Sequence, residues 1–276
     1  MHTFFNWQLV VSYFPQILSA LPVTLIIVAI ASVIGILLGA IIGFIRIEKV
    51  PGLNQIGAIF VSFIRGTPIL VQLYLVYYGA PALLSLIGID AQQWNKLYFL
   101  FITYGLNTAA FQSETIRAAF LSVPALQKEA CLACGFTKRQ TYLKVIIPQA
   151  VRVAIPSFST ITISLLQDTS LAFTIGVVDV VGKAKAIGTS TFHTMEGYVD
   201  AAIIFIVLSF ILEKAFAYLA KKMTIQDQLA TTPKPSFFRF NHHVSTTVPN
   251  ETLTKTPIPP TYVNKPEGSS NHAEKV

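Results

Sequence analysis

Few ionisable or amide side chains interrupt the long apolar stretches of this 276-residue chain. The candidates among them for contact with a solute are Arg65, Gln72, Glu114, Gln167 and Asp168, together with Arg117. A charge at the centre of a membrane helix costs roughly 2.5–3.5 kcal/mol, so such a side chain usually faces a cavity or a partner. Arg65 could bind the carboxylate of a zwitterionic solute, and Glu114 or Asp168 could bind its ammonium group.

The same side chains also have a purely structural interpretation, and the sequence leaves both open. Arg65 and Arg117 could lie near one membrane surface and extend their charged ends into water. Glu114 precedes Arg117 by three residues, a spacing at which two side chains on one helix can pair. Gln72 and Gln167 are uncharged candidates for the same solute pathway.

A polar loop over residues 121–150 carries the second candidate site. Pro124 can begin a short helix, because its fixed φ suits the first helical position. Small residues follow Glu129, namely Ala130, Cys131, Ala133 and Cys134, and Gly135 then permits a sharp turn. A second short amphipathic segment precedes Pro148. Such a helix–turn–helix could dock into a groove of another protein, or it could simply lie at the membrane surface.

Catalytic and metal-binding patterns are not found in the sequence. Cys131 and Cys134 have neither the four ligands that a zinc site needs nor the βαβ setting of a redox motif. The five histidines show no ligand spacing. Gly176 and Gly182-Lys183 are separated by five residues and precede Ala184, whereas a phosphate-binding loop needs four residues and then Ser or Thr. We therefore expect no enzyme activity, no metal and no ATP site in this chain.

The composition assigns these residues to a membrane protein. Hydrophobic residues make up 53% of the chain and charged residues only 12%, about half the share found in soluble domains. The net charge of +7 does not indicate nucleic-acid binding, because the cations lie between the apolar runs, where they orient a membrane protein.

Five apolar runs are long enough to cross a bilayer, which takes about 20 residues. They cover approximately residues 17–45, 54–87, 97–119, 151–180 and 199–220. The second and fourth exceed one simple span, so we expect breaks at Gly66-Thr67-Pro68, at Pro156 and at Asp168-Thr169-Ser170. In the first run, Gly35, Gly39 and Gly43 share one helix face and predict a close helix contact. The sequence predicts an all-α polytopic membrane protein.

Charge counting predicts the orientation of the chain. With the N-terminal segment 1–16 outside, the inner loops and ends hold ten Lys and Arg residues, and the outer loops hold only Lys96, Lys183 and Lys185. This bias agrees with the positive-inside rule and puts the C-terminus in the cytoplasm. The segment 223–276 is rich in Pro, Thr and Ser and is predicted to be a disordered cytoplasmic tail.

The polar loop resembles the EAA loop of ABC importer permeases. The matching residues are Glu129-Ala130-Cys131, then Gly135, then Val145-Ile146-Ile147-Pro148, with Cys131, Val145 and Ile147 as departures from the family pattern. Three further runs resemble the polar amino-acid branch: Arg65-Gly66-Thr67-Pro68, Ser113-Glu114 with Arg117, and SLLQDTSLAFTIGV around Asp168. The resemblance covers residues 17–222. The family often has Lys where this chain has Gln167.

The resemblance implies a type I permease fold of about five spans, with Glu129, Ala130, Cys131, Gly135 and Pro148 in a coupling loop. It also implies three kinds of partner: a second permease copy or paralogue, two ATPase subunits that carry ATP and Mg, and an extracytoplasmic binding protein. The implied location of this assembly is the plasma membrane. Alternating access would import a polar amino acid. The stretch QDTSLAFTIGVVDVVGKAKAIG is similar to cystine-type permeases, while glutamine-, histidine- and arginine-type substrates remain open. The alternative is an ion-gradient-driven transporter, which would need inverted repeats that the sequence lacks.

Overall fold

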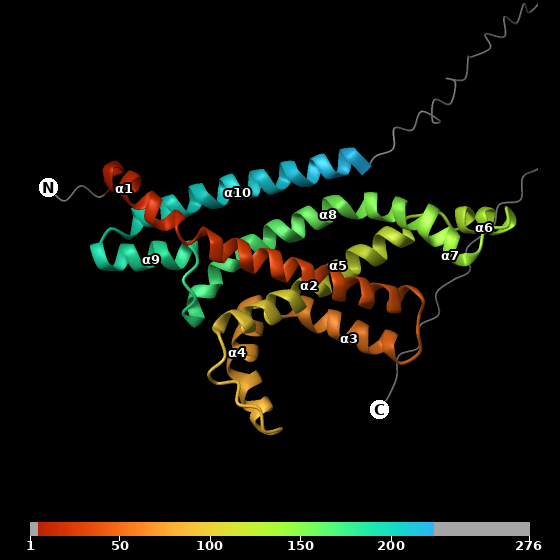
Figure 1. Cartoon of the computed structure of the whole chain (residues 1–276), viewed down its shortest axis with the longest axis horizontal. Coiled ribbons are helices and arrows are strands. Elements are labelled where there is room, and N and C mark those ends of the chain that lie inside the picture. Colours follow the sequence, from red (N-terminus) through yellow and green to blue (C-terminus); the bar gives the residue numbers. More distant parts are fainter. Residues whose placement is uncertain (1–4, 224–276) are drawn as a thin grey trace, which may run out of the picture. The chain divides into compact units, whose positions relative to one another are not determined.

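The computed structural model describes residues 5–223, and this part of the chain is helical with no strand (Figure 1). The helices are α1 (Trp7–Leu18), α2 (Leu21–Ile47), α3 (Leu53–Gly66), α4 (Ile69–Ser85), α5 (Lys96–Leu121), α6 (Ala125–Ala133), α7 (Lys138–Thr141), α8 (Ile147–Asp168), α9 (Val180–Thr191) and α10 (Thr194–Met223). A π-helical turn, η1 (Tyr142–Ile146), and a 3-10 helix, η2 (Thr169–Ile175), flank α8. The all-α prediction is confirmed. The tail predicted over 223–276 lies, beyond Met223, outside the described residues.

Three helical stretches of the described chain are long and apolar enough to cross a membrane, namely α2, the run Lys138–Ile175, and α10. The bent pair α3 and α4 qualifies as a fourth if it is one span. The remaining predicted span corresponds to α5, whose 26 residues would extend about 39 Å. It is more polar than the others, but twelve of its residues are buried among its neighbours. The structure is therefore roughly consistent with the predicted five spans.

The first predicted span begins later than expected, and a separate helix precedes it. α1 occupies residues that we predicted to form an extracytoplasmic segment, and Asn6 caps it by accepting a hydrogen bond from the Gln8 amide. The chain then breaks at Ser19–Ala20 before α2. Pro22 explains the break, because its ring lacks an N–H and would clash with the carbonyl of the residue four positions earlier.

α2 and α5 pack side by side through the three glycines that the sequence places on one face. A Cβ at Gly35 would lie 2.5 Å from Cγ2 of Thr108, and one at Gly39 would lie 3.0 Å from the carbonyl oxygen of Ala109. A Cβ at Gly43 would lie 3.1 Å from a carbonyl oxygen of α5. The predicted close helix contact is confirmed, and side chains at these positions would force the two backbones apart.

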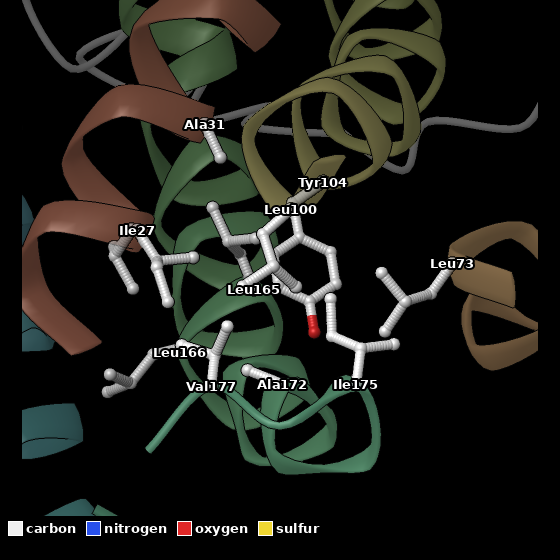
Figure 2. Close-up of a cluster of buried hydrophobic side chains, with 11 residues drawn as sticks. Ile27, Ala31, Leu73, Leu100, Tyr104, Leu165, Leu166, Ala172, Ile175 and Val177 are labelled. Atoms are coloured by element: carbon white, nitrogen blue, oxygen red, sulfur yellow. The ribbon is translucent and has the colours of Figure 1, made fainter. Parts of the chain in front are cut away.

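The apolar core joins α2 and α5 to the end of α8 (Figure 2). Its buried members are Ile27, Val28 and Ala31 of α2, Leu73 of α4, Leu100 and Tyr104 of α5, Leu165 and Leu166 of α8, Ala172 and Ile175 of η2, and Val177. The hydroxyl of Tyr104 donates a hydrogen bond to the backbone carbonyl of Asp168 at 2.9 Å. This bond fixes the point at which α8 gives way to η2.

The break predicted at Gly66-Thr67-Pro68 is confirmed, since the chain bends there by 111° between α3 and α4. The side-chain amide of Gln72 holds this bend, donating to the Ile64 carbonyl at 2.7 Å and to the Thr67 carbonyl and hydroxyl at 3.0 and 2.8 Å. The backbone groups that the bend frees are therefore paired with a side chain.

The break predicted at Pro156 is wrong, because α8 runs without interruption from Ile147 to Asp168. Its buried residues, such as Ile155 before the proline and Leu165 after it, hold the helix against its neighbours. Packing of this kind lets membrane helices tolerate proline. The second predicted break, at Asp168-Thr169-Ser170, is present as the change from α8 to η2. η2 ends at Gly176, whose φ is +81°.

We expect Gly39→Val to destabilise the bundle by about 1–3 kcal/mol, because the added side chain overpacks the α2–α5 contact. Gly79→Val is the matched control, since Gly79 is also helical but nothing lies within 4 Å of its Cβ position. Thermal unfolding of the two purified variants measures the difference. Equal loss of stability in both would contradict the close contact.

Candidate functional site

The predicted docking loop forms a short exposed helix followed by a tight turn. Pro124 caps α6, and none of the residues of α6 is buried by the rest of the described chain. Leu126 and Leu132 are 72% and 41% exposed. Gly135 adopts a φ of +82° directly after α6, as its predicted turn requires. An exposed helix with apolar side chains on its surface has the character of a docking element.

The segment after α6 is anchored to the bundle on two sides. The hydroxyl of Tyr142 donates a hydrogen bond to Glu48, the residue after α2, at 3.2 Å and accepts one from Lys128 of α6 at 3.2 Å. Gln149 of α8 donates to the side-chain carbonyl of Gln127 in α6 at 2.6 Å. Pro148 lies in the first turn of α8. These hydrogen bonds tie α6 to the base of α8 and to the end of α2.

A second site lies at the other end of α8, where a cavity of about 270 Å³ opens between α5 and α8. Its lining consists of Asn107, Thr108 and Phe111 from α5 and Thr160, Ile161, Ser164, Leu165 and Asp168 from α8. Asp168 supplies the only charged side chain of this lining. An amide and several hydroxyl groups accompany it, so the cavity offers a carboxylate and neutral hydrogen-bonding groups to a polar solute.

Sequence reasoning found Asp168 but missed the other polar residues of this cavity. Thr160, Ser164 and Asp168 follow one another at intervals of four, which puts them on one face of α8. This spacing of polar residues could have been recognised in the sequence as one polar face of a helix. Asn107 gave no comparable signal, because only the fold brings it opposite α8.

Two of the predicted pathway residues reach the cavity only through a neighbour. Gln72 is 4% exposed, and its side-chain carbonyl accepts a hydrogen bond from Asn107 at 2.9 Å. Its donors are already used in the α3–α4 bend, so Gln72 positions Asn107. Arg65 is exposed, and its guanidinium lies 5.5 Å from the ring centre of Phe111, which lines the cavity. A cation thus lies against the ring of one of the residues that line the cavity.

Glu114 and Gln167 do not line this cavity. Glu114 instead pairs with Arg46 of α2, and its other oxygen pairs with Arg117 at 2.9 Å. The Glu114–Arg117 pairing that the sequence left open is therefore present, and Arg46 joins it from the neighbouring helix. Gln167 is exposed on α8. Of the five residues proposed for one pathway, the structure brings only Asp168 directly to the cavity.

Metal-binding side chains are not grouped within residues 5–223, where no three His, Cys, Asp or Glu residues could hold one ion. Cys131 and Cys134 are free thiols on and just after α6.

Comparison with known proteins decides the family. The family model described as the binding-protein-dependent transport system inner membrane component matches residues 35–225. The chain belongs to this family. Its members are membrane components of transport systems, which agrees with a multi-pass membrane protein. The matched residues include both the α6 segment and the cavity beside Asp168.

Two relatives in this transport family cover most of the chain. The L-cystine transport system permease protein TcyL of Bacillus subtilis (strain 168) is 37% identical over 223 residues, which are 81% of this chain and 93% of that protein. The nopaline transport system permease protein NocM of Agrobacterium fabrum is 32% identical over 210 residues, 75% of this chain and 87% of that protein.

Solved structures of transporters share the fold. A crystal structure of an amino acid ABC transporter with histidines matches with a TM-score of 0.70 and 27% identity, covering 80% of this chain and all of that chain. The inward-facing MetNI methionine ABC transporter matches with a TM-score of 0.60 at 17% identity, covering 73% of this chain and 93% of that chain. The predicted ABC importer permease fold is confirmed.

We expect Arg46→Gln to lower the free energy of unfolding by about 2 kcal/mol, because it removes a charged hydrogen bond between partly buried side chains. Arg117→Gln is the control at the same carboxylate. Arg117 is 36% exposed, against 15% for Arg46, so its loss should cost less than about 1 kcal/mol. Denaturant titration of both variants gives the comparison, and a larger effect at Arg117 would contradict the assignment.

Proposed function

We propose that this chain is the permease subunit of an ABC importer for a polar amino acid, with cystine as the leading substrate. The cavity beside Asp168 is the observation that carries the proposal. A carboxylate, an amide and several hydroxyl groups line it, and the Arg65 guanidinium lies 5.5 Å from the ring centre of Phe111, which is part of the lining. Asp168 would bind the substrate ammonium, and Arg65 would attract its carboxylate.

The choice of cystine rests on relatives. The cystine permease of Bacillus subtilis is 37% identical to this chain, and a second L-cystine permease of that organism, TcyB, is 36% identical over 208 residues. The nopaline relative has a different substrate, so family membership supports an amino acid or amino-acid derivative more firmly than it supports cystine.

A separate partner protein would bind the ATP that powers transport by this permease. The exposed α6 helix, with Glu129, Ala130 and Cys131, would dock on a partner ATPase that binds ATP and Mg. Gly135 would form the bend of the coupling segment. Closure of two ATPase subunits would draw two such segments together, so a second permease copy or a paralogue is required. An extracytoplasmic binding protein would deliver the amino acid. The N-terminus of the permease would lie outside and its C-terminus in the cytoplasm.

The source of energy separates this proposal from an ion-gradient-driven amino-acid transporter. The transporter, purified from its native membranes and reconstituted in proteoliposomes with its binding protein, should accumulate labelled cystine only when ATP is present on the ATPase side. Competition by other unlabelled amino acids would then rank the substrates. Uptake that follows a proton or sodium gradient without ATP would overturn the proposal.

We expect Asp168→Asn to reduce ATP-dependent uptake at least about tenfold, because losing one charged hydrogen bond costs roughly 1.5–3 kcal/mol. Asp90→Asn is the control. Asp90 is an exposed carboxylate whose oxygen accepts a hydrogen bond from Gln92, and asparagine preserves that acceptor. The measurement is initial uptake rate at equal protein amount, and normal uptake by Asp168→Asn would remove this residue from the pathway.

Gly135→Val should abolish uptake while the protein remains in the membrane, because valine resists a φ of +82° and would distort the coupling bend. Gly88→Val is a matched control, since Gly88 has a φ of +81° and neither glycine has an atom within 4 Å of its Cβ position. Uptake and membrane abundance are measured for both. Equal uptake by the two variants would contradict a coupling function for Gly135.

A further inference from the structure

An entirely apolar groove of about 220 Å³ runs between α2, α5 and α8. Alanines form its floor, with Ala119, Ala150 and Ala154 at 3% exposure or less. Larger side chains border it, among them Phe44, Phe120 and Phe158. Ile36 and Phe44 are 45% and 36% exposed, so the groove opens on the outside of the described bundle. Its shape and chemistry suit a hydrocarbon chain.

A second cavity, of about 290 Å³, lies toward α6, and we call it the polar cavity because Glu48, Lys49, Lys128 and Tyr142 interrupt its otherwise apolar lining. Phe120 lines both spaces, so the two share one wall residue. The lining of the polar cavity consists of Ile47, Glu48 and Lys49 after α2, Phe120, Leu121 and Val123 at the end of α5, Pro124, Ala125 and Lys128 of the α6 segment, and Tyr142 and Ile146 of η1. A single amphipathic molecule that passes Phe120 would meet charged groups at the end of the bundle and apolar side chains along its side.

The polar cavity has one more positive charge than negative charge. Its only carboxylate, on Glu48, already accepts the hydrogen bond of the Tyr142 hydroxyl, and Lys128 donates to that hydroxyl. Lys49 makes no hydrogen bond or ion pair with the described residues, and its backbone adopts a φ of +50°, unusual for a residue other than glycine. Its ammonium group therefore remains available to an anion.

We propose that the groove and the polar cavity together bind one anionic phospholipid. Its phosphate lies beside Lys49 and Lys128, and one acyl chain lies along the alanine floor between α2, α5 and α8. A free phosphate would leave the groove empty, and a neutral lipid would leave the one excess positive charge of the cavity without a counter-charge. Basic pockets between membrane helices recognise anionic head groups in this way.

The test uses the full chain, purified in detergent, and a phosphatidylglycerol that carries a photoreactive group in its acyl chain. After illumination, we expect the label on peptides that contain Phe44, Phe120 or Phe158. Unlabelled phosphatidylglycerol should compete for the site, whereas phosphatidylcholine should not. Equal competition by the two lipids, or displacement of the label by inorganic phosphate alone, would overturn the proposal.

Variants separate the head-group contact from the acyl-chain contact. Lys49→Gln and Lys128→Gln should each weaken retention of phosphatidylglycerol about fivefold, the effect of one cation near an anionic surface. Lys138→Gln, on the exposed α7, is the matched control and should change nothing. Ala40→Trp should block labelling by filling the groove, whereas Val33→Trp, at a position 57% exposed on the same helix, should not. Labelling that survives Lys49→Gln, Lys128→Gln and Ala40→Trp would overturn the proposal. Unchanged unfolding temperatures would establish that the variants fold.

Discussion

The contact between α2 and α5 is the interaction on which the other features depend. At Gly35, Gly39 and Gly43 the two helices approach so closely that no Cβ fits without displacing α5. Packing replaces the hydrophobic effect as the force that joins helices inside a bilayer, so small residues at such a contact are its main source of stability. This contact thereby fixes the position of α5 at the centre of the bundle. It carries Asn107 and Tyr104 toward α8, and its C-terminal end leads directly into the α6 segment.

α8 links the two candidate sites. Its base is tied to the α6 segment through Gln149, and its other end carries Asp168 into the cavity. The helix is continuous over 22 residues, which corresponds to about 33 Å. Tyr104 holds the far end by its bond to the Asp168 carbonyl. A continuous helix of this length could carry a displacement of α6 to the cavity, as the proposed coupling to a partner ATPase requires.

The features that the sequence predicted correctly are those determined by local chemistry. The glycine face of α2, the α3–α4 bend and the left-handed turn at Gly135 all follow from residue type and spacing. The features that it missed depend on tertiary contacts. Helix α8 continues through Pro156 because its neighbours hold it. Asn107 lines the cavity because the fold packs α5 against α8. The side-chain amide of Gln72 is already hydrogen-bonded in the α3–α4 bend, so Gln72 contacts Asn107 and not the cavity. Glu114 belonged to an ion-pair cluster because Arg46, 68 residues earlier, packs beside it.

The most direct test of the central claim is recovery of the partner ATPase with the tagged chain from native membranes. The account predicts that an ATPase subunit co-purifies, that the complex hydrolyses ATP, and that scrambling residues 129–135 removes both. Scrambling residues 83–89, a segment of the same length that covers the end of α4 and the start of the loop to α5, should leave both intact. Recovery of this chain alone from native membranes, without nucleotide hydrolysis, would contradict the account.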